Sequence, residues 1–492
     1  MFNFLQVFYL LTFITLLSCS HKSSGIKDPP IKPPVNPPVQ NPVQETAYAF
    51  PGAEGFGKNA TGGRGGAVME VANLNDAGTG SLRAAVAGSL PKIVVFRVSG
   101  TIRLLSKLQI GANTTIAGQT APGDGICLSD HPVVISGDNV VVRFMRFRMG
   151  DRYQNKGMVD GSGSDDAFGN LGNNNLMIDH CSVSWSSDEA LTIYRGDNVT
   201  IQWCFITEPL NYSYHFEAGD TDYEQHGYGG IWGSKHGSFH HNLFAHCKSR
   251  TPRFAGVSTY NPAIAGIEIA DFRNNVIYNW GINNVYGGEG GYYNMVNNYF
   301  KSGPSTTSRK YQVVAIDSSA QYPYAQYFLS GNYVAGSPAN TANNWLSVFM
   351  KSGKLADTVK SKVATPFSVE NITLHSAEQA YTLVLQKAGC VRPNRDTLDE
   401  RILNDAKNST GRIIDVQGGF SHGTAFEKTL NAWPALKSGT TLVDTDHDGM
   451  PDDWEKANGL NPNDAGDAEK NTLSTGYTNV EIYINSLAKD LY

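Results

Sequence analysis

The segments NNNLMIDHCSVS (residues 173–184) and GDNVTIQWCFIT (residues 196–207) decide the predicted fold. In each, an asparagine at a turn precedes a run of alternating apolar and β-branched residues, and Asn175 and Asn198 are 23 residues apart. Two earlier segments, GANTTIAGQ (residues 111–119) and GDNVVVRFMRFR (residues 137–148), have the same form. A repeat of this length and pattern is typical of one coil of a parallel β-helix, so we predict an all-β solenoid.

Later segments continue the repeat: SFHHNLFAH (238–246), DFRNNVIYNW (271–280) and NMVNNYF (294–300). They place five small or amide side chains at equivalent positions, namely Cys181, Cys204, Asn242, Asn275 and Asn298. Equivalent residues of such a solenoid stack about 4.8 Å apart, and stacked asparagines form hydrogen-bonded ladders. The spacing permits a disulfide between Cys181 and Cys204, but we favour small side chains stacked in the core. Steps of 36 residues (139 to 175) and 38 residues (204 to 242) indicate coils with long loop insertions.

Composition agrees with a turn-rich β protein, since 492 residues include 51 glycines and only 17% charged residues. The net charge of −6 is mild, and no long run of one sign indicates nucleic-acid binding. We therefore expect no nucleic-acid partner.

Four regions are predicted along the chain. Residues 1–19 resemble a bacterial lipoprotein signal, with an apolar run before Leu16-Leu17-Ser18-Cys19 and lipidation at Cys19; an ordinary signal peptide is the alternative. Residues 20–46 form a proline-rich linker, 47–438 the solenoid domain with C-terminal covering segments, and 439–492 a calcium-binding segment. Helical patterns at 376–389 and 396–408 are expected to cover the end of the solenoid. We expect an exported monomer, secreted or lipid-anchored to the outer membrane and touching the membrane only through that anchor.

Eight segments, in order, resemble the pectate lyases of polysaccharide lyase family 1 over residues 49 to 300. They are AFPGAEGFGKNATGGRGG, NLNDAGTGSLRAAV, IVVFRVSGTI, TIAGQTAPGDGI, IDHCSVSWSSDEALTIY, HGYGGIWG, HHNLFAHCKSRTPRF and RNNVIYNW. The resemblance implies a right-handed, single-stranded parallel β-helix with long loop insertions. It also implies calcium-dependent cleavage of polygalacturonate, the demethylated form of the acidic plant polysaccharide pectin. That cleavage is a β-elimination, which releases 4,5-unsaturated oligogalacturonides.

Such an elimination needs a site of mixed charge, because a proton leaves a carbon beside a carboxylate that must be neutralised. Residues 225–267 contain no Asp or Glu, yet eight basic or histidine side chains fall between Lys235 and Arg253. Carboxylates lie just upstream, at Asp165, Asp166, Asp179, Asp188 and Glu189. If coils stack, these segments place a carboxylate patch beside a basic patch.

Arg250 matches the arginine of the family's R-x-P motif, which is the proposed base. An arginine side chain keeps its proton at neutral pH, so a role as electrostatic partner of the developing charge is physically easier to explain, and Lys235 and His236 remain alternative bases. Arg253, Lys235 and Arg148 are predicted to bind substrate, Arg148 because Arg146 and Arg148 share one face of a strand. Aromatic residues of the insertion at 207–236 either stack on sugars or pin that loop.

Asp166 and Asp188 fall on two of the family's calcium-ligand positions. Two other acidic positions of the family are Ser164 and Thr192 here. Either Glu189 compensates, or substrate carboxylates complete the six to eight oxygens that calcium prefers.

A second calcium site is predicted in DTDHDGMPDDWE (residues 444–455), which fits the pattern D-x-D-x-D-G-x5-E. Its predicted ligands are Asp444, Asp446, Asp448, the Met450 carbonyl, Asp452 and Glu455, with Gly449 at the sharp turn. Its place near the chain end suggests a structural clip like those of thrombospondin-type repeats.

Three functions compete on this fold: a calcium-dependent pectate lyase, a polygalacturonase or pectin lyase, and a non-catalytic binder of acidic glycans. Hydrolysis by a polygalacturonase needs a set of strand-borne aspartates that the sequence does not show. Thr192 and Ser164 are the best support for a binding protein. We favour the lyase.

Overall fold

The computed structural model describes residues 42–492, except 157–162, 164, 257–267, 319–321 and 352. The predicted signal segment with Cys19, most of the proline-rich linker, and Ser164 lie outside the described residues. Among the described residues, no helix is both long and apolar enough to span a membrane.

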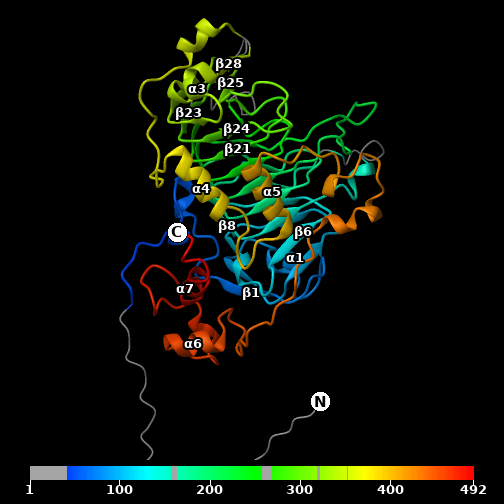
Figure 1. Cartoon of the computed structure of the whole chain (residues 1–492). Helices are drawn as coiled ribbons and strands as arrows, with labels where there is room; N and C mark the ends of the chain where they lie inside the picture. The colour runs from blue at the N-terminus through cyan, green and yellow to red at the C-terminus, as the bar shows by residue number, and fades with distance from the viewer. Residues whose placement is uncertain (1–41, 157–162, 164, 257–267, 319–321, 352) are drawn as a thin grey trace, which may run out of the picture. The chain divides into compact units, whose positions relative to one another are not determined.

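Three sheets, in which every strand pair is parallel, form the body of the protein (Figure 1). The first contains β1 (Ala67–Val71), β2 (Lys92–Phe96), β5 (Thr114–Ala117), β8 (Val140–Arg143), β11 (Leu176–Asp179), β14 (Val199–Gln202), β17 (His236–His240), β20 (Ile269–Arg273), β23 (Tyr292–Val296) and β26 (Gln326–Ser330). The second contains β4 (Leu108–Ile110), β7 (Val133–Ile135), β10 (Phe168–Leu171), β13 (Leu191–Gly196), β16 (Ile231–Ser234), β19 (Arg253–Phe254), β22 (Val285–Gly287), β25 (Val314–Ile316) and β28 (Val348–Met350). The third contains β3 (Gly100–Arg103), β6 (Ile126–Ser129), β9 (Arg146–Arg148), β12 (Ser182–Ser184), β15 (Phe205–Thr207), β18 (Leu243–Ala245), β21 (Val276–Tyr278), β24 (Tyr299–Lys301) and β27 (Tyr333–Val334).

From β2 onward the chain visits the three sheets in rotation, so each coil adds one strand to each sheet, and the predicted parallel β-helix is confirmed. The register follows the 23-residue step seen in the sequence, because Leu176 of β11 pairs with Val199 of β14. Ile178, Val183 and Ile193 point into the single large apolar core between the sheets. Alternation along each strand then leaves the neighbouring side chains on the outer faces.

An asparagine ladder runs through one turn of the coils. Asn242 Nδ2 donates to Asn275 Oδ1 at 3.0 Å, Asn275 to Asn298 at 3.1 Å, and Asn298 to Asn332 at 2.8 Å. Each acceptor oxygen also takes the backbone N–H of the preceding asparagine, as Asn275 Oδ1 does from Asn242 at 3.0 Å. All four amides are fully buried, so the ladder satisfies polar groups that water cannot reach.

Cys181 and Cys204 continue this ladder as the sequence predicted. The Cys204 N–H donates to Asn242 Oδ1 at 2.8 Å, and the Cys181 N–H donates to Cys204 Sγ at 3.4 Å. Both cysteines are free and buried, so the reading as stacked small side chains is confirmed for this structure.

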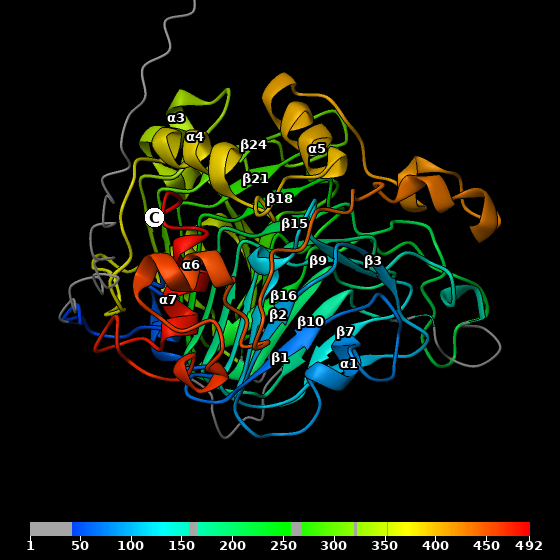
Figure 2. The same ribbon diagram turned by 90° about the horizontal axis from the view of Figure 1, so that it is seen from below.

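The two predicted helices form, but their predicted place was wrong. α4 (Ala377–Lys387) begins with a capping box at Ser376 and Gln379, and α5 (Thr397–Asn408) begins after the N-cap Asp396. Their apolar side chains pack on the outer face of the third sheet, where Val384 and Ile402 join the cluster that contains Phe205 and Leu243. Figure 2 shows both helices beside β18, β21 and β24. They cover a flank rather than an end, because this outer face is apolar.

Four other α-helices are described: α1 (Leu82–Ala85), α3 (Pro338–Ala342), α6 (Asp452–Asn458) and α7 (Asn479–Ser486). The segment with α6 and α7 packs against the first sheet, since Met450 and Ile484 share a cluster with Ile93 and Val95 of β2 (Figure 2). The chain end is also fixed, because the Tyr492 hydroxyl donates to Asp179 Oδ2 at 2.5 Å.

We predict that Asn275→Ala destabilises the fold strongly. It leaves the buried N–H and Nδ2 of Asn242 without their shared acceptor, and each unsatisfied buried group costs about 1–3 kcal/mol, so the free energy of unfolding should fall by about 2–5 kcal/mol. Denaturant unfolding measures the loss. The control is Asn198→Gly, because Asn198 donates to Asn175 at 3.3 Å near the surface, and glycine tolerates the local φ of 55°. A loss of equal size in both variants would contradict the role of the buried ladder.

Candidate active site

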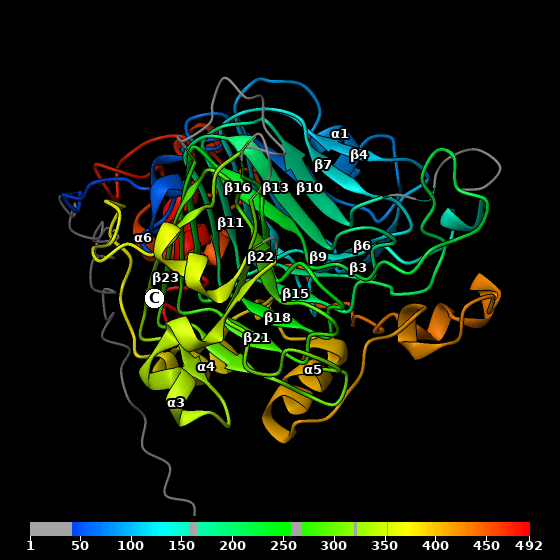
Figure 3. The same cartoon turned by 90° about the horizontal axis from the view of Figure 1, so that it is seen from above.

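A cleft of about 380 Å³ lies on the outer face of the second sheet. Four residues in mutual register form its floor: Val134 of β7, Gly169 of β10, Thr192 of β13 and Ile231 of β16. Figure 3 shows these strands side by side. The other lining residues are Lys107, Pro132, Asp165, Asp166, Asn170, Leu171, Asp188, Glu189, Tyr194, Glu217, His226 and Arg250.

Turn residues just before the strands bring the charged groups together. The Glu189 N–H donates to Asp166 Oδ1 at 3.0 Å, and Tyr228 forms parallel bridges to Glu189 on one side and to Ser249 on the other. Asp166 and Glu189 are 23 residues apart, which is one coil. Successive rungs beside the cleft therefore carry Asp166, Glu189, Tyr228 and Ser249, and the side chain of Arg250, which follows Ser249, reaches back past Tyr228 to Glu189.

Asp166, Asp188 and Glu189 offer oxygen atoms that all lie within 4.8 Å of one another. Asp188 Oδ1 and Glu189 Oε1 are buried; the first lies 2.5 Å from His226 Nε2, and Glu189 forms an ion pair with Arg250. Three converging carboxylates fit a hard divalent cation such as calcium. The three predicted cleft ligands are thus brought together, with room for further oxygens from a bound molecule.

Burial raises the pKa of Asp166 well above its ordinary value, and the charge of Asp188 adds to that shift. A hydrogen bond from Thr192 offsets it only in part. For Asp188, burial by itself would raise the pKa, but contacts with His215 and His226 outweigh burial and lower it. Asp188 is therefore kept ionised, whereas Asp166 resists ionisation unless a cation is bound.

Arg250 enters the cleft at the end of the carboxylate cluster. Its guanidinium forms an ion pair with Glu189, Nε donates to the Tyr286 hydroxyl at 3.3 Å, and Cζ lies 4.4 Å from the ring centroid of Tyr228. The side chain is 18% exposed, so it is held in place yet open to the cleft. The negative charge of Glu189 attracts the guanidinium and holds it in this position.

Known proteins resemble this chain over most of its length. Probable pectate lyase C of Aspergillus fumigatus is 35% identical across 90% of this chain and 94% of that protein. The protein of the same name in Aspergillus flavus is 37% identical across 90% of this chain and 95% of its own length. The chain belongs to the pectate lyase family. It is therefore a polysaccharide lyase.

Two further comparisons add no argument about the site. No model of a protein family matches the sequence. Among solved structures, jun a 1, the major allergen from cedar pollen, is 16% identical with a TM-score of 0.44, and the match covers 68% of this chain and 92% of that chain.

In this pectate lyase Arg148 does not have the predicted position. It is fully buried on β9 in the third sheet, where Nη2 lies 2.8 Å from Asp396 Oδ2 and 2.9 Å from Asp399 Oδ1. Arg146 is buried beside it. The prediction that Arg148 binds substrate is wrong for this structure, because α5 covers the residue and supplies its counter-charges.

The other basic residues divide between the cleft and its surroundings. Lys235 is exposed at the turn between β16 and β17, and His236 pairs with Asp197 at 2.7 Å; neither is among the residues that line the cleft. Arg253 pairs in register with the cleft residue Ile231, so it lies one strand farther along the same outer face. Lys107 lines the cleft and was missed, because it belongs to an early coil outside the basic segment.

The aromatic residues of the insertion mainly hold the loop. Trp232 is fully buried in the core, and Tyr212 stacks on His422 with ring centroids 4.2 Å apart. Tyr228 packs between Arg250 and His226. The pinning role is the one these contacts support.

The C-terminal acidic loop also forms a cluster of carboxylates. Oxygens of Asp444, Asp446 and Asp448 lie within 4.8 Å of one another, as do those of Asp448, Glu455 and Asp467. Five of the oxygens from Asp446, Asp448 and Glu455 are buried without a hydrogen bond in the described structure. This arrangement fits a hard cation.

Two residues of this loop differ from the prediction. Asp452 accepts hydrogen bonds from the Thr445 N–H at 2.8 Å and its hydroxyl at 2.9 Å, and it belongs to neither carboxylate cluster. Asp467 takes part instead, with Oδ1 buried and without a hydrogen bond. It lies beyond the motif in sequence, so only the acidic character of the segment after α6 hinted at it.

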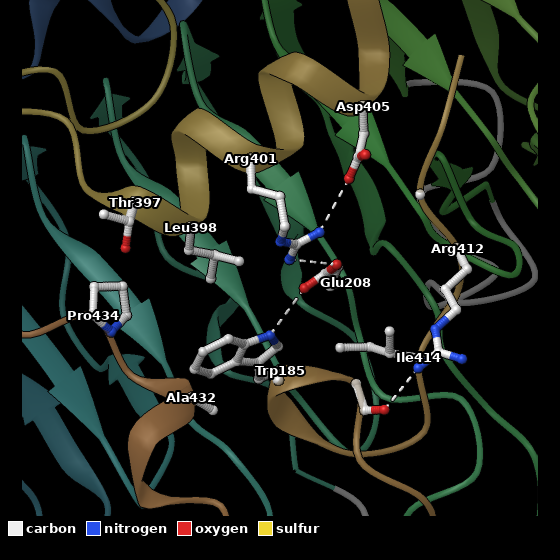
Figure 4. Close-up of a pocket in the computed structure, with 13 residues that line it drawn as sticks. Trp185, Glu208, Thr397, Leu398, Arg401, Asp405, Arg412, Ile414, Ala432 and Pro434 are labelled. Carbon is white, nitrogen blue, oxygen red and sulfur yellow. Dashed lines mark hydrogen bonds and ion pairs between the residues drawn. The ribbon is translucent and has the colours of Figure 1, made fainter. Parts of the chain in front are cut away.

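A larger cavity of about 690 Å³ lies between α5 and the third sheet and shares no residue with the cleft. Figure 4 shows how its charges are used internally: Arg401 lies 2.7 Å from Glu208 and 3.1 Å from Asp405, and Trp185 Nε1 donates to Glu208 at 3.3 Å. Trp185 exposes no ring surface for a sugar. We therefore place the chemistry in the smaller cleft, where three carboxylates converge beside Arg250.

We predict that the metal-free protein loses stability as pH rises. Burial and the neighbouring carboxylates raise the pKa of Asp448 to about 8 and that of Glu455 to about 7. Unfolded carboxyl groups titrate near about 4, so from about pH 4 to 8 the folded state binds more protons than the unfolded state, and the free energy of unfolding falls with rising pH. Thermal unfolding in a chelator, compared across this range with an excess of calcium, measures the effect.

The matched variant is Asp448→Asn with Glu455→Gln, in which neither group titrates. Its melting temperature in chelator should depend less on pH than that of the unchanged protein. Equal slopes for both proteins would show that this cluster is not responsible.

Proposed function

We propose that this protein is a calcium-dependent pectate lyase that cleaves polygalacturonate by β-elimination to 4,5-unsaturated oligogalacturonides. The observation that carries the proposal is the meeting of three carboxylates and Arg250 in one cleft on the outer face of the second sheet. The names of the relatives at 35–37% identity support the same activity.

The cleft residues assign a place to each charge of the substrate. Asp166, Asp188 and Glu189 would hold calcium, which supplies positive charge to neutralise the uronate carboxylate beside C5. Arg250 would contact the reacting sugar. Arg253, which lies one strand away from Ile231, would contact a neighbouring carboxylate of the substrate. An acidic polymer would then lie across the strands of the sheet.

The elimination removes the proton from C5 while the bond between C4 and O4 breaks. The electron pair of the C–H bond forms the double bond between C4 and C5, and O4 leaves with the departing chain and gains a proton. Arg250 is the group placed to take the C5 proton, which it accepts as the neutral guanidine, and O4 gains its proton from water; Lys235 and His236 lie outside the cleft lining. Glu189 and the Tyr286 hydroxyl orient its planar guanidinium toward the developing negative charge.

The C-terminal loop is proposed to hold a structural calcium ion, with Asp444, Asp446, Asp448, Glu455 and Asp467 as ligands. It is tied to the first coils, since Arg97 lies 3.2 Å from both Asp444 and Glu70. The export signal, the lipid anchor at Cys19, the outer-membrane location and the monomeric state remain proposals from the sequence.

We predict that Arg250→Lys lowers kcat on the order of 10³-fold, comparable with the loss of a preorganised oxyanion donor. Lysine keeps the charge but loses the planar fork that reaches both Glu189 and the substrate. Steady-state kinetics on polygalacturonate, with calcium constant and the unsaturated product followed by its ultraviolet absorbance, measure the change. Near-normal kcat in the lysine variant would remove Arg250 from the chemistry.

Arg253→Ala is the matched comparison in the same assay. Because Arg253 lies beyond the carboxylate cluster, its loss should mainly raise KM and leave kcat within a few-fold. A large fall in kcat with unchanged KM would place Arg253 at the reacting sugar instead.

We predict that a chelator abolishes cleavage of polygalacturonate and that added calcium restores it. Only elimination yields the ultraviolet-absorbing product, so the same assay separates a lyase from a hydrolase and from a binding protein. The control is Asp444→Ala with Asp448→Ala, which should lower the melting temperature but keep calcium-dependent activity in folded protein. Undiminished cleavage in chelator would overturn the calcium requirement.

A further inference from the structure

The loop between β15 and β16 carries a second cluster of ligand atoms, next to the carboxylates of the cleft. Asp188, His215 and His226 offer an oxygen and two ring nitrogens that all lie within 4.8 Å of one another. His226 Nε2 lies 2.5 Å from Asp188 Oδ1, and His215 Nε2 lies 3.7 Å from the same oxygen. Three donors from two segments of chain thus converge on one point.

These nitrogens are buried and lack proper hydrogen bonds. The side chains of His215 and His226 are 1% and 7% exposed, and the Nε2 atoms of both rings, like Asp188 Oδ1, make no hydrogen bond of acceptable geometry in the described structure. Close approach without aligned hydrogen bonds is what a set of metal ligands shows, because each donor points at the ion rather than at another donor. Donor atoms of a tetrahedral zinc site lie about 3.3 Å apart, given zinc–nitrogen distances of about 2.0–2.1 Å, so the pair at 3.7 Å is close to this separation, whereas the pair at 2.5 Å must move apart when a metal binds.

The carboxylate of Glu224 lies close to Nδ1, the second ring nitrogen of His215. Its Nδ1 lies 3.2 Å from Glu224 Oε1, and the Glu224 N–H donates to the His215 carbonyl at 3.2 Å. A carboxylate this close to Nδ1 can take its proton when a metal binds Nε2, as in the outer shell of metal-bound histidines, although Nδ1 makes no aligned hydrogen bond in the described structure. The backbone N–H of His226 donates to the Asn211 carbonyl at 2.7 Å, and the two rings stack with centroids 3.8 Å apart.

We propose that Asp188, His215 and His226 form a site for a borderline divalent transition metal of the zinc class, distinct from the oxygen-only calcium cluster. Two imidazoles and one carboxylate favour zinc or cobalt over calcium, which prefers oxygen ligands. Asp188 belongs to both clusters, to one with the two imidazoles and to the other with Asp166 and Glu189. A metal at this point fastens the insertion loop to the edge of the cleft.

The test is metal binding by the full chain with calcium in large excess, so that the oxygen-only sites are filled. Titration with Co²⁺ should show one equivalent bound per chain, with the visible absorption of a nitrogen- and oxygen-ligated tetrahedral ion, and one equivalent of Zn²⁺ should displace it. His215→Gln and His226→Gln should each weaken binding on the order of 100-fold or more. Glu224→Gln, which removes only the outer partner, should weaken it about 10–100-fold.

Two matched variants identify other sources of binding. His236→Gln removes a half-exposed histidine paired with Asp197, and Asp446→Asn removes a ligand of the C-terminal cluster. Both should bind Co²⁺ as the unchanged protein does. Because the readout is metal binding, the result stands apart from the success or failure of the proposed catalytic chemistry.

X-ray absorption at the zinc edge tests the unchanged protein without any variant. Two imidazoles in the zinc shell would support the proposal, whereas a shell of oxygens alone would overturn it. Absence of stoichiometric Co²⁺ binding in calcium, or binding unchanged in both histidine variants, would overturn it as well. In that case the histidines serve as charged partners of Asp188 and Glu224.

Discussion

The stacked hydrogen bonding between coils is the constraint on which this molecule depends. Parallel strands of successive coils pair along all three sheets, and the buried amides from Asn242 to Asn332 repeat the same contact in one turn. A buried amide that lacks its neighbour leaves donors unsatisfied, so each coil is held in register by the next. The rigidity of the cleft follows from this.

Because the coils stack rigidly, the number of residues between two positions in the sequence fixes how far apart they lie in the structure. Asp166 and Glu189 are one coil apart, and Arg250 follows after the insertion, so the three side chains meet without any of them being close in sequence. Their surroundings then set their chemistry. Burial raises the pKa of Asp166, the histidines lower that of Asp188, and an ion pair with Glu189 positions the guanidinium of Arg250.

The C-terminal part of the chain covers two outer faces of the solenoid. α4 and α5 cover the apolar outer face of the third sheet, and the acidic loop with α6 and α7 packs on the first sheet. The covering that contains α5 also supplies counter-charges for a buried arginine, since Asp396 and Asp399 neutralise Arg148. The outer face of the second sheet keeps the open cleft in which three carboxylates meet Arg250.

The repeat determined the coil and the ladder through Cys181, Cys204 and the asparagines; coil stacking together with the family resemblance predicted that Asp166, Asp188 and Glu189 lie close to Arg250. These are residues inside the repeating unit, where equal spacing means equal position. Other features were decided only in the folded molecule. They are the burial of Arg148, the exposure of Lys235, the place of Asp467 rather than Asp452 in the C-terminal cluster, and the convergence of His215 and His226 on Asp188. Each depends on a segment outside the period, such as α5, the insertion or the chain end, and such a segment finds its place through tertiary packing that no spacing in the sequence encodes.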